Sequence, residues 1–423
     1  MKRYNAYKDS GVKWIGEIPS HWDTKQFRRF FLIKKDVANC LGYDVLSVTQ
    51  KGLKVKDIES NEGQMANDYS KYQIVEVGDF VMNSMDLLTG YIDCAKQKGV
   101  TSPDYKSFRV RQAINLDKQY YLYIFQFCYK GRIFYNLGRG VSNKGRWRLP
   151  SENLNRFMLP VPPLHEQQAI VDYLKDKTFK IEQYVSARER ERELLDSLKQ
   201  SEIANVVTRG LNPNVKMKDS GIPWIGEIPE HWEPCRNKDI FEESKKIVGE
   251  NSSDHVLLSL TKQGVIVRDL SENKGKFPKE FNTYKVVEPG DMIFCMFDVD
   301  ETPRTVGLSQ NHGMITGAYD VFKIKRVLPK FALYYYLSID DRKALRPLYK
   351  GLRKVVPLPT FMSSKIFLPP LSEQQAIVAY IDEKLQKIDQ YMCDLLREID
   401  YLKEFKQRLI SDAVTGQLCV TKQ

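Results

Sequence analysis

Two short segments carry several cations and no acid. Residues 138–148 read GRGVSNKGRWR, and residues 342–354 read RKALRPLYKGLRK. Arginine and lysine neutralise phosphates, and arginine or asparagine can also reach base edges in the major groove of DNA. The alternative is a solvated basic surface without a ligand. The candidates for DNA contact in these segments are Arg139, Asn143, Lys144, Arg146, Arg148, Arg346, Lys350, Arg353 and Lys354.

Two glycine-containing turns offer weaker candidates for the same chemistry. LSVTQKGLKVKD at 46–57 and LSLTKQGVIVRD at 258–269 alternate apolar and polar residues around a glycine, which predicts hairpins or short strands. Side chains near these turns, with two more from residues 304–311, are possible DNA contacts or simply surface loops. This second set is Lys51, Lys54, Lys262, Gln263, Arg304 and Asn311.

The bulk composition fits a polyanionic partner. The net charge is +11 and the isoelectric point is near 9.0, which favours nucleic acid without proving it. The longest apolar–aromatic run, residues 120–129, is too short to span a membrane, and residues 1–11 lack the apolar core of a signal peptide. We therefore expect a cytoplasmic protein with no membrane contact.

Signatures of catalysis and of metal binding are missing from the sequence. We find no phosphate-binding GxxxxGK[ST] loop, no HExxH or GxSxG, and no Asn/Asp-Pro-Pro-aromatic run of an adenine methyltransferase. The seven cysteines are scattered without a CxxC pair, which argues against a zinc site or a disulfide framework. The sequence predicts no catalytic residues, no metal site and no enzymatic activity of its own.

The elements that must position the basic segments occur twice. Residues 7–22 and 217–232 are identical at twelve of sixteen positions, and both contain WIGEIP followed by HW. PPLHEQQAIV at 162–171 and PPLSEQQAIV at 369–378 form a second pair. The chain is thus a tandem repeat of a unit of about 200 residues. We expect the first pair of blocks to be ordered loops in which the tryptophans, Trp14 and Trp22 in the first copy, are packed as anchors.

Between these paired blocks, each copy predicts an α/β domain. YQIVEVGDFVMN at 72–83 and YKVVEPGDMIFC at 284–295 each predict a strand, a Gly-Asp turn and a second strand. Helical stretches follow at 119–136 and 331–346. The two middles differ in sequence, although their patterns agree.

A long helix follows each Pro-Pro-Leu block. Each is expected to contain about 45 residues and to be about 65 Å long, and helices of this length with an apolar stripe need a partner. The connection after the first helix is too short for parallel pairing, so we predict an antiparallel coiled coil. Its seam is Ile170, Leu174, Ile181, Val185, Leu195 and Leu198 in the first helix, and Ile377, Ile381, Leu385, Ile388, Met392, Leu395, Ile399 and Leu402 in the second.

The first helix interrupts its own seam. Thr178, Arg188 and Arg192 stand where apolar residues are expected. Two interpretations stay open for the arginines: they pair with acids of the second helix such as Asp394 and Glu398, or they face another protein.

Through these paired blocks and the helix after each, the chain resembles the specificity subunit of type I restriction–modification enzymes. The resemblance covers essentially the whole chain. It implies two α/β target-recognition domains, residues 1–160 and 212–367, and two helical spacer regions, residues 161–211 and 368–423, that pair as an antiparallel coiled coil in a pseudo-twofold repeat. Each domain would read one half of an asymmetric, interrupted site in double-stranded DNA, and the coiled coil would set the gap.

The same resemblance implies the partners. Methyltransferase subunits, two in number, would dock on the chain and methylate adenine N6, and restriction subunits would add translocation and cleavage. S-adenosylmethionine, ATP and Mg²⁺ would be bound by those partners and not by this chain. Two other classes remain: a scaffold that assembles proteins without reading DNA, and an unrecognised nuclease or methyltransferase.

Overall fold

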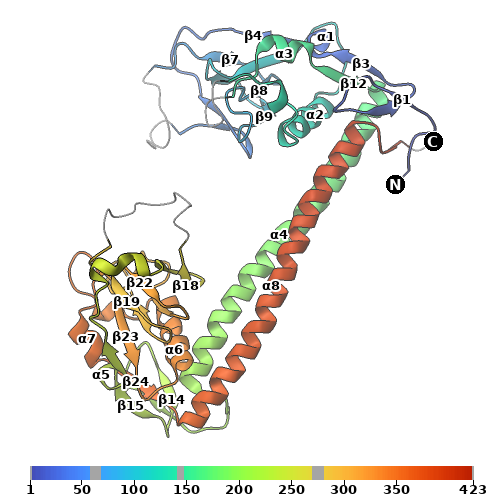
Figure 1. Ribbon diagram of the computed structural model, residues 1–423. Helices are drawn as coiled ribbons and strands as arrows, with labels where there is room; N and C mark the ends of the chain where they lie inside the picture. Colours follow the sequence, from blue (N-terminus) through green and yellow to red (C-terminus); the bar gives the residue numbers. More distant parts are fainter. Residues whose placement is uncertain (1, 58–67, 141–146, 269–280, 422–423) are drawn as a thin grey trace. The chain divides into compact units, whose positions relative to one another are not determined.

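The computed structural model describes residues 2–57, 68–140, 147–268 and 281–421. The chain divides into two compact units. The first unit comprises Met1–Arg188 and Glu398–Gln423, and the second comprises Glu189–Arg397. Each unit contains one α/β domain and a part of both long helices (Figure 1).

The first α/β domain is built on a four-stranded antiparallel sheet in the order β4-β11-β8-β9. These strands are β4 (Phe31–Lys34), β11 (Lys106–Val110), β8 (Phe80–Met82) and β9 (Ile92–Cys94). Four two-stranded sheets accompany it: β1 (Tyr7–Asp9) with β2 (Glu17–Pro19), β3 (Asp23–Gln26) with β12 (Met158–Val161), β5 (Leu46–Thr49) with β6 (Gly52–Val55), and β7 (Gln73–Val75) with β10 (Gly99–Thr101). The helices are α1 (Phe27–Phe30), α2 (Lys118–Lys130), η1 (Tyr135–Leu137) and α3 (Ser151–Arg156).

The second α/β domain repeats this topology strand for strand. Its four-stranded sheet has the order β16-β23-β20-β21, with β16 (Phe241–Glu243), β23 (Asp320–Ile324), β20 (Met292–Phe294) and β21 (Val306–Leu308). The paired strands are β13 (Met217–Asp219) with β14 (Glu227–Pro229), β15 (Glu233–Arg236) with β24 (Lys365–Leu368), β17 (Leu258–Thr261) with β18 (Gly264–Val267), and β19 (Lys285–Val287) with β22 (Gly313–Ile315). The helices are α5 (Asn237–Ile240), η2 (Gly249–Asp254), α6 (Pro329–Asp341), η3 (Arg346–Leu348) and α7 (Leu358–Ser363).

Aromatic rings fill the core of each domain. In the first, Phe31 packs edge-to-face against Phe80, Phe108 and Phe125 at centroid distances of 5.3–5.6 Å. All four rings are buried. Such edge-to-face pairs stabilise the domain beyond the burial of their apolar area. The helix that supplies Phe125, α2, is therefore fixed against the sheet.

The predicted strand–turn–strand units are confirmed in both copies. The turn between β7 and β8 places Gly78 at a φ of 86°, and the turn between β19 and β20 places Gly290 at 92°. In each, the following aspartate accepts a hydrogen bond of 2.9 Å from a backbone N–H three residues earlier, Asp79 from Glu76 and Asp291 from Glu288. Glycine is favoured at these positions because a side chain would strain the left-handed backbone.

A buried carboxylate joins the two repeated sequence blocks of the first copy. Glu166, only 5% exposed, accepts hydrogen bonds from Trp22 Nε1 and Tyr4 OH at 2.9 Å each and pairs with His21 Nε2 at 2.6 Å. Burial alone would raise the pKa of Glu166, but the hydrogen bonds from Trp22, His21 and Tyr4 outweigh burial and lower it. Trp22 is fully buried, as predicted for an anchor.

The second copy builds the same junction. Glu373 pairs with His231 Nε2 at 2.8 Å and accepts from Trp232 Nε1 at 3.3 Å. In both copies the next residue is a glutamine that reaches the start of the domain's main helix. Gln167 Oε1 accepts from the N–H of Asp117, and Gln374 Oε1 accepts from the N–H of Leu328, both at 2.9 Å.

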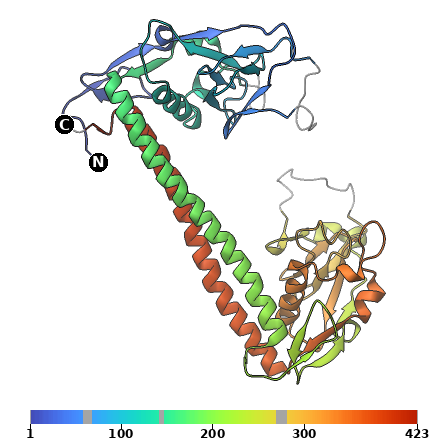
Figure 2. The ribbon, with the colours of Figure 1, turned by 180° about the vertical axis from the view of Figure 1, so that it is seen from behind.

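Helices α4 (Leu164–Arg209) and α8 (Leu371–Val414) lie side by side in both views (Figures 1 and 2). Ion pairs show their antiparallel direction within each unit. In the first, Arg188 Nε lies 3.2 Å from Glu398 Oε2, and Lys406 pairs with Glu182. In the second, Lys199 Nζ lies 2.7 Å from Asp389 Oδ1. The predicted fold class, two α/β domains with a pair of long antiparallel helices, is confirmed.

The seam of α8 is buried or half-buried throughout its predicted positions, and that of α4 is buried at Ile170 and Leu174. The middle of the α4 seam is polar. Arg188 has a carboxylate partner in Glu398, one of the two acids named from the sequence, and Arg192 is half-buried. Leu198 is a correction: it is 48% exposed, and the neighbouring Lys199 takes the position that faces α8.

We predict that the first junction stabilises its unit mainly through the Glu166 charge. Glu166→Gln should lower the free energy of unfolding at pH 7 by about 1–3 kcal/mol, because buried hydrogen bonds to a charged group are lost. Glu152→Gln, which changes an exposed carboxylate paired with Arg156, is the matched control. Urea unfolding followed by tryptophan fluorescence measures both.

The pH dependence has a defined sign. The folded-state pKa of Glu166 lies below its unfolded value, so this stabilisation is present above the unfolded value of about 4.3 and is lost as the pH falls through the folded pKa. The difference between the wild type and Glu166→Gln should therefore shrink below about pH 4. A difference that is absent at pH 7, or that grows on acidification, would show that the carboxylate charge is unimportant.

Candidate nucleic-acid interface

The two predicted hairpins present their turns in the same geometry. Thr49 Oγ1 donates to the carbonyl of Gly52 at 2.8 Å, and Thr261 Oγ1 donates to that of Gly264 at 3.1 Å. The glycines adopt φ values of 103° and 100°. The side chains between threonine and glycine are thereby held outward. Of the candidates here, Lys51, Lys54, Lys262 and Gln263 are all exposed.

Both basic segments are closed by a pair of backbone hydrogen bonds. Arg139 and Arg148 exchange bonds of 2.8 and 3.0 Å, and Lys350 and Val355 exchange bonds of 2.8 and 3.1 Å. Arg139 and Arg148 are exposed. The remaining candidates of the first loop, Asn143, Lys144 and Arg146, lie outside the described residues.

The tip of the second loop points its side chains into solvent. Gly351 and Lys354 have left-handed φ values of 69° and 46°, which turn the chain sharply between the closing bonds. Leu352 is fully exposed and Arg353 is exposed beside it. The backbone carbonyl of Arg353 accepts from the N–H of Asp298 at 3.0 Å, so the tip is fixed to the domain.

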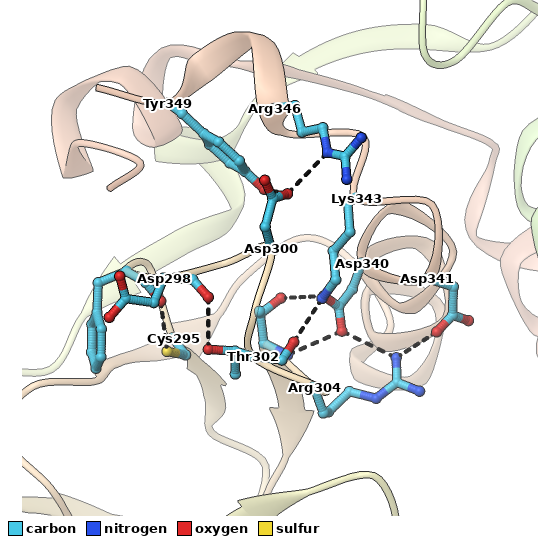
Figure 3. Close-up of polar contacts among 12 residues, drawn as sticks. Cys295, Asp298, Asp300, Thr302, Arg304, Asp340, Asp341, Lys343, Arg346 and Tyr349 are labelled. Carbon is cyan, nitrogen blue, oxygen red and sulfur yellow. Dashed lines mark hydrogen bonds and ion pairs between the residues drawn. The ribbon is translucent and has the colours of Figure 1, made fainter. Parts of the chain in front are cut away.

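Two other candidates of this segment are neutralised by one acid. Asp300 Oδ1 lies 2.9 Å from Arg346 Nε, and Asp300 Oδ2 lies 3.1 Å from Lys354 Nζ (Figure 3 shows the first of these contacts). The hydrogen bond from Arg346 lowers the pKa of Asp300, and Lys354 adds to the effect. Sequence reasoning missed Asp300, because an acid 46 residues before its partner gives no local signal.

Arg304 is used inside the second domain. Its guanidinium lies 3.2 Å from Asp340 and 2.9 Å from Asp341 at the end of α6, and Lys343 also pairs with Asp340 at 2.7 Å (Figure 3). Asp340 is buried and also accepts from the backbone and hydroxyl of Thr305. Removing one partner of such a buried network leaves an uncompensated charge. Arg304 therefore holds the loop before β21 to the end of α6, and its role as a DNA contact stays a prediction.

Lys262 and Gln263 lie on a groove of about 660 Å³ in the second unit. The groove is bounded by the β17–β18 turn, the loops around β21, and α6, and by residues of α4 and α8. Gln310 lines it, whereas Asn311 is half-buried next to it in the chain. The structure thus brings together the second turn and the loop at 304–310, whereas the basic loop at 350–355 does not line this groove.

The described part of the chain contains no cluster of three or more His, Cys, Asp or Glu side chains suited to a metal ion. Within that part, no helix is long and apolar enough to cross a membrane. The polar groups brought together by the fold are cations, amides and internal ion pairs. Such groups suit phosphate and base-edge contacts.

Known proteins agree with this arrangement. A family model described as "Type I restriction modification DNA specificity domain" matches residues 27–186. The chain is 23% identical to the putative type I restriction enzyme MjaX specificity subunit of Methanocaldococcus jannaschii, over 98% of both chains. It is 25% identical to the MjaVIII specificity subunit of the same organism, over 62% of both.

A solved structure shows that the fold is shared as well. It comes from work on complex assembly and conformational transition of the type I R-M system. The matched chain has a TM-score of 0.66 at 13% identity, with 95% of this chain and 99% of that chain covered. Residues 27–186 thus match the DNA specificity domain of type I restriction–modification systems, and the chain is similar in sequence, over nearly its whole length, to a specificity subunit of such a system.

Proposed function

We propose that each α/β domain reads one half of an interrupted DNA site and that the site is asymmetric. The observation that carries this proposal is the repeated topology with unlike side chains at equivalent loops. The closed basic loop carries arginines at both closing positions in the first copy, and Lys350 and Val355 in the second. Equal scaffolds with different contact residues bind different base sequences.

We further propose that α4 and α8 together set the distance between the two half-sites. The ion pairs between the helices, such as Arg188–Glu398 and Lys199–Asp389, fix one antiparallel register in each unit. A paired helix is stiffer than a single chain segment and holds its ends at a length of about 1.5 Å per residue.

The outer faces of the long helices are suited to protein partners. In the first unit, Phe179 and Tyr184 of α4 and Tyr401 and Phe405 of α8 are exposed. Exposed aromatic residues in such number are typical of protein interfaces. We propose that methyltransferase subunits, two per chain, dock along the helices, and that restriction subunits join them where the system cleaves.

In this proposal the chain supplies recognition and its partners supply catalysis. Adenine N6 methylation, with S-adenosylmethionine, takes place on the methyltransferase subunits, and ATP and Mg²⁺ act with the restriction subunits. The chain has no catalytic site of its own and works in the cytoplasm, where the DNA is.

Reversing the charge of the basic loops tests DNA contact. In the complex with methyltransferase subunits, Arg139→Glu and Arg353→Glu should each lower affinity for target DNA roughly tenfold or more, because a charge-assisted contact is lost and a repulsion is gained. Lys325→Glu makes the same charge change on another exposed side chain, paired with Glu242, and should have a smaller effect. Unchanged affinity in both loop variants would favour the scaffold alternative.

Shortening both helices together tests the spacer. The antiparallel pairing places residues 189–195 of α4 opposite residues 392–398 of α8, so both heptads must be removed at once. The deletion shortens the helix pair by about 10 Å. Because seven residues are close to two helical turns, the residues on either side of the deletion keep their orientation about the helix axis to within about 20°. The gap in the methylated motif should shrink by about three base pairs while each half stays the same. Sequencing of methylated adenines gives the answer, and an unchanged gap would rule out the ruler.

A further inference from the structure

A cationic pocket in the first α/β domain has no role in the description above. Its volume is about 300 Å³, and its floor and rim include the ends of β4 and β11 and the start of α3. Polar side chains dominate its lining. The ones that matter for the argument are Lys35, Lys71, Lys106, Arg148, Asp104 and Ser151.

The positive charge of this pocket is not balanced. Asp104 pairs with Arg148 at 3.3 Å, and the buried Lys34 at the pocket wall is neutralised by Asp79 at 2.5 Å. In the described part of the chain, neither Lys35 nor Lys106 has a carboxylate within ion-pair distance. Lys106 Nζ donates to Ser151 Oγ at 2.9 Å. Burial lowers the pKa of Lys106, and the nearby charges of Lys35 and Arg148 lower it further.

The second copy shows that the fold does not require this pocket. In the first domain Lys106 lies opposite Met82 of β8, and in the second Asp320 lies opposite Phe294 of β20. Because Phe108 and Phe322 occupy matching positions in these registers, Asp320 is the counterpart of Lys106. Asp320 is neutralised by Lys285 at 3.2 Å.

Two more lining groups are replaced at matching positions. Arg148 and Val355 each close the equivalent loop, and Ser151 and Leu358 each begin the equivalent short helix. The second domain therefore has a neutral ion pair and two apolar residues where the first domain has two cations and a hydroxyl. A half-buried cation without a carboxylate partner, as Lys106 is among the described residues, costs stability, so its presence in only one copy points to a ligand.

We propose that this pocket binds a phosphate of the DNA backbone, with Lys35, Lys106 and Arg148 as its ligands, and that the second domain lacks such a site. The inference rests on the proposed function, since it assumes that the first domain meets DNA. Arg148 exchanges backbone hydrogen bonds with Arg139, so one bound phosphate would hold both arginines at the duplex. Phosphate contacts position a protein on DNA without reading sequence.

The test uses the complex of the full chain with its methyltransferase subunits and duplexes that carry one neutral methylphosphonate linkage at a time. For the wild-type complex, one linkage near the first half-site should lower affinity roughly tenfold. The Lys106→Met complex should bind the unmodified duplex more weakly than the wild-type complex by about the same factor. Its affinity should not fall further when the duplex carries that methylphosphonate linkage. Its dependence of log affinity on log salt should be less steep by about 0.9.

Two further variants keep the experiment decisive. Lys35→Met removes an exposed pocket cation without disturbing the core and should reproduce the effect of Lys106→Met. Lys96→Met removes an exposed lysine of the same domain that does not line the pocket. This control complex should still lose affinity when the methylphosphonate stands at the linkage that weakens wild-type binding. Both pocket variants should weaken target and scrambled duplexes by the same factor, because the contact carries no sequence information.

The failures of the two proposals are distinguishable. Suppose that both pocket variants bind DNA with wild-type affinity, respond to the methylphosphonate linkages as the wild type does, and still prefer target over scrambled DNA. That result would overturn the proposed phosphate site and leave the proposed function intact. A wild-type complex that shows no preference for target over scrambled DNA would overturn the proposed function. Binding of inorganic phosphate that depends on Lys106, combined with unaltered DNA binding in both variants, would assign the pocket to a free anion instead.

Discussion

The carboxylate at the start of each long helix, buried in the first copy and half-buried in the second, is the interaction on which the rest of the structure depends. Glu166 and Glu373 each hold the indole and imidazole of the preceding Trp-His block, so each helix start is fixed to its α/β domain. The other end of each helix meets the same block of the opposite copy. Gly416 after α8 lies against Trp22, and Gly210 after α4 lies against Trp232. Each domain is thus clamped by one helix start and one helix end.

This arrangement separates what must stay constant from what is free to vary. The junctions, the Gly-Asp turns and the sheet orders are the same in both copies. The charges around the sheets differ: a lysine at 106 corresponds to an aspartate at 320, and an arginine at 148 corresponds to a valine at 355. A rigid scaffold tolerates such exchanges at exposed loops, because the stability of the domain comes from the aromatic core.

The sequence was informative wherever a pattern has a local physical cause. Burial of Trp22 and Trp232, the Gly-Asp turns and the two long helices follow from repeated blocks, turn chemistry and apolar spacing. Interactions between residues distant in sequence were not predictable in this way. The partners of Arg304, Asp340 and Asp341, lie 36 and 37 residues away in the chain and gave no local signal. Asp300 and the pocket around Lys106 were missed for the same reason.

The helix seam shows where pattern reasoning reaches its limit. Apolar periodicity selected Leu198, yet this side chain is 48% exposed and the neighbouring Lys199 meets Asp389 of α8. Ion pairs across the seam specify a register that leucines alone do not. The DNA contacts themselves remain a prediction, because the residues that discriminate bases lie on loops where charge and position are the only sequence signals.

The central claim is that this chain gives a methyltransferase complex its DNA sequence preference. Mapping N6-methyladenine across the host genome, with the gene present and then deleted, tests it most directly. We predict that deletion abolishes methylation at one interrupted, two-part, asymmetric motif and that re-expression restores it. A methylation pattern that is unchanged by deletion, in a host without a second gene of this kind, would contradict the account.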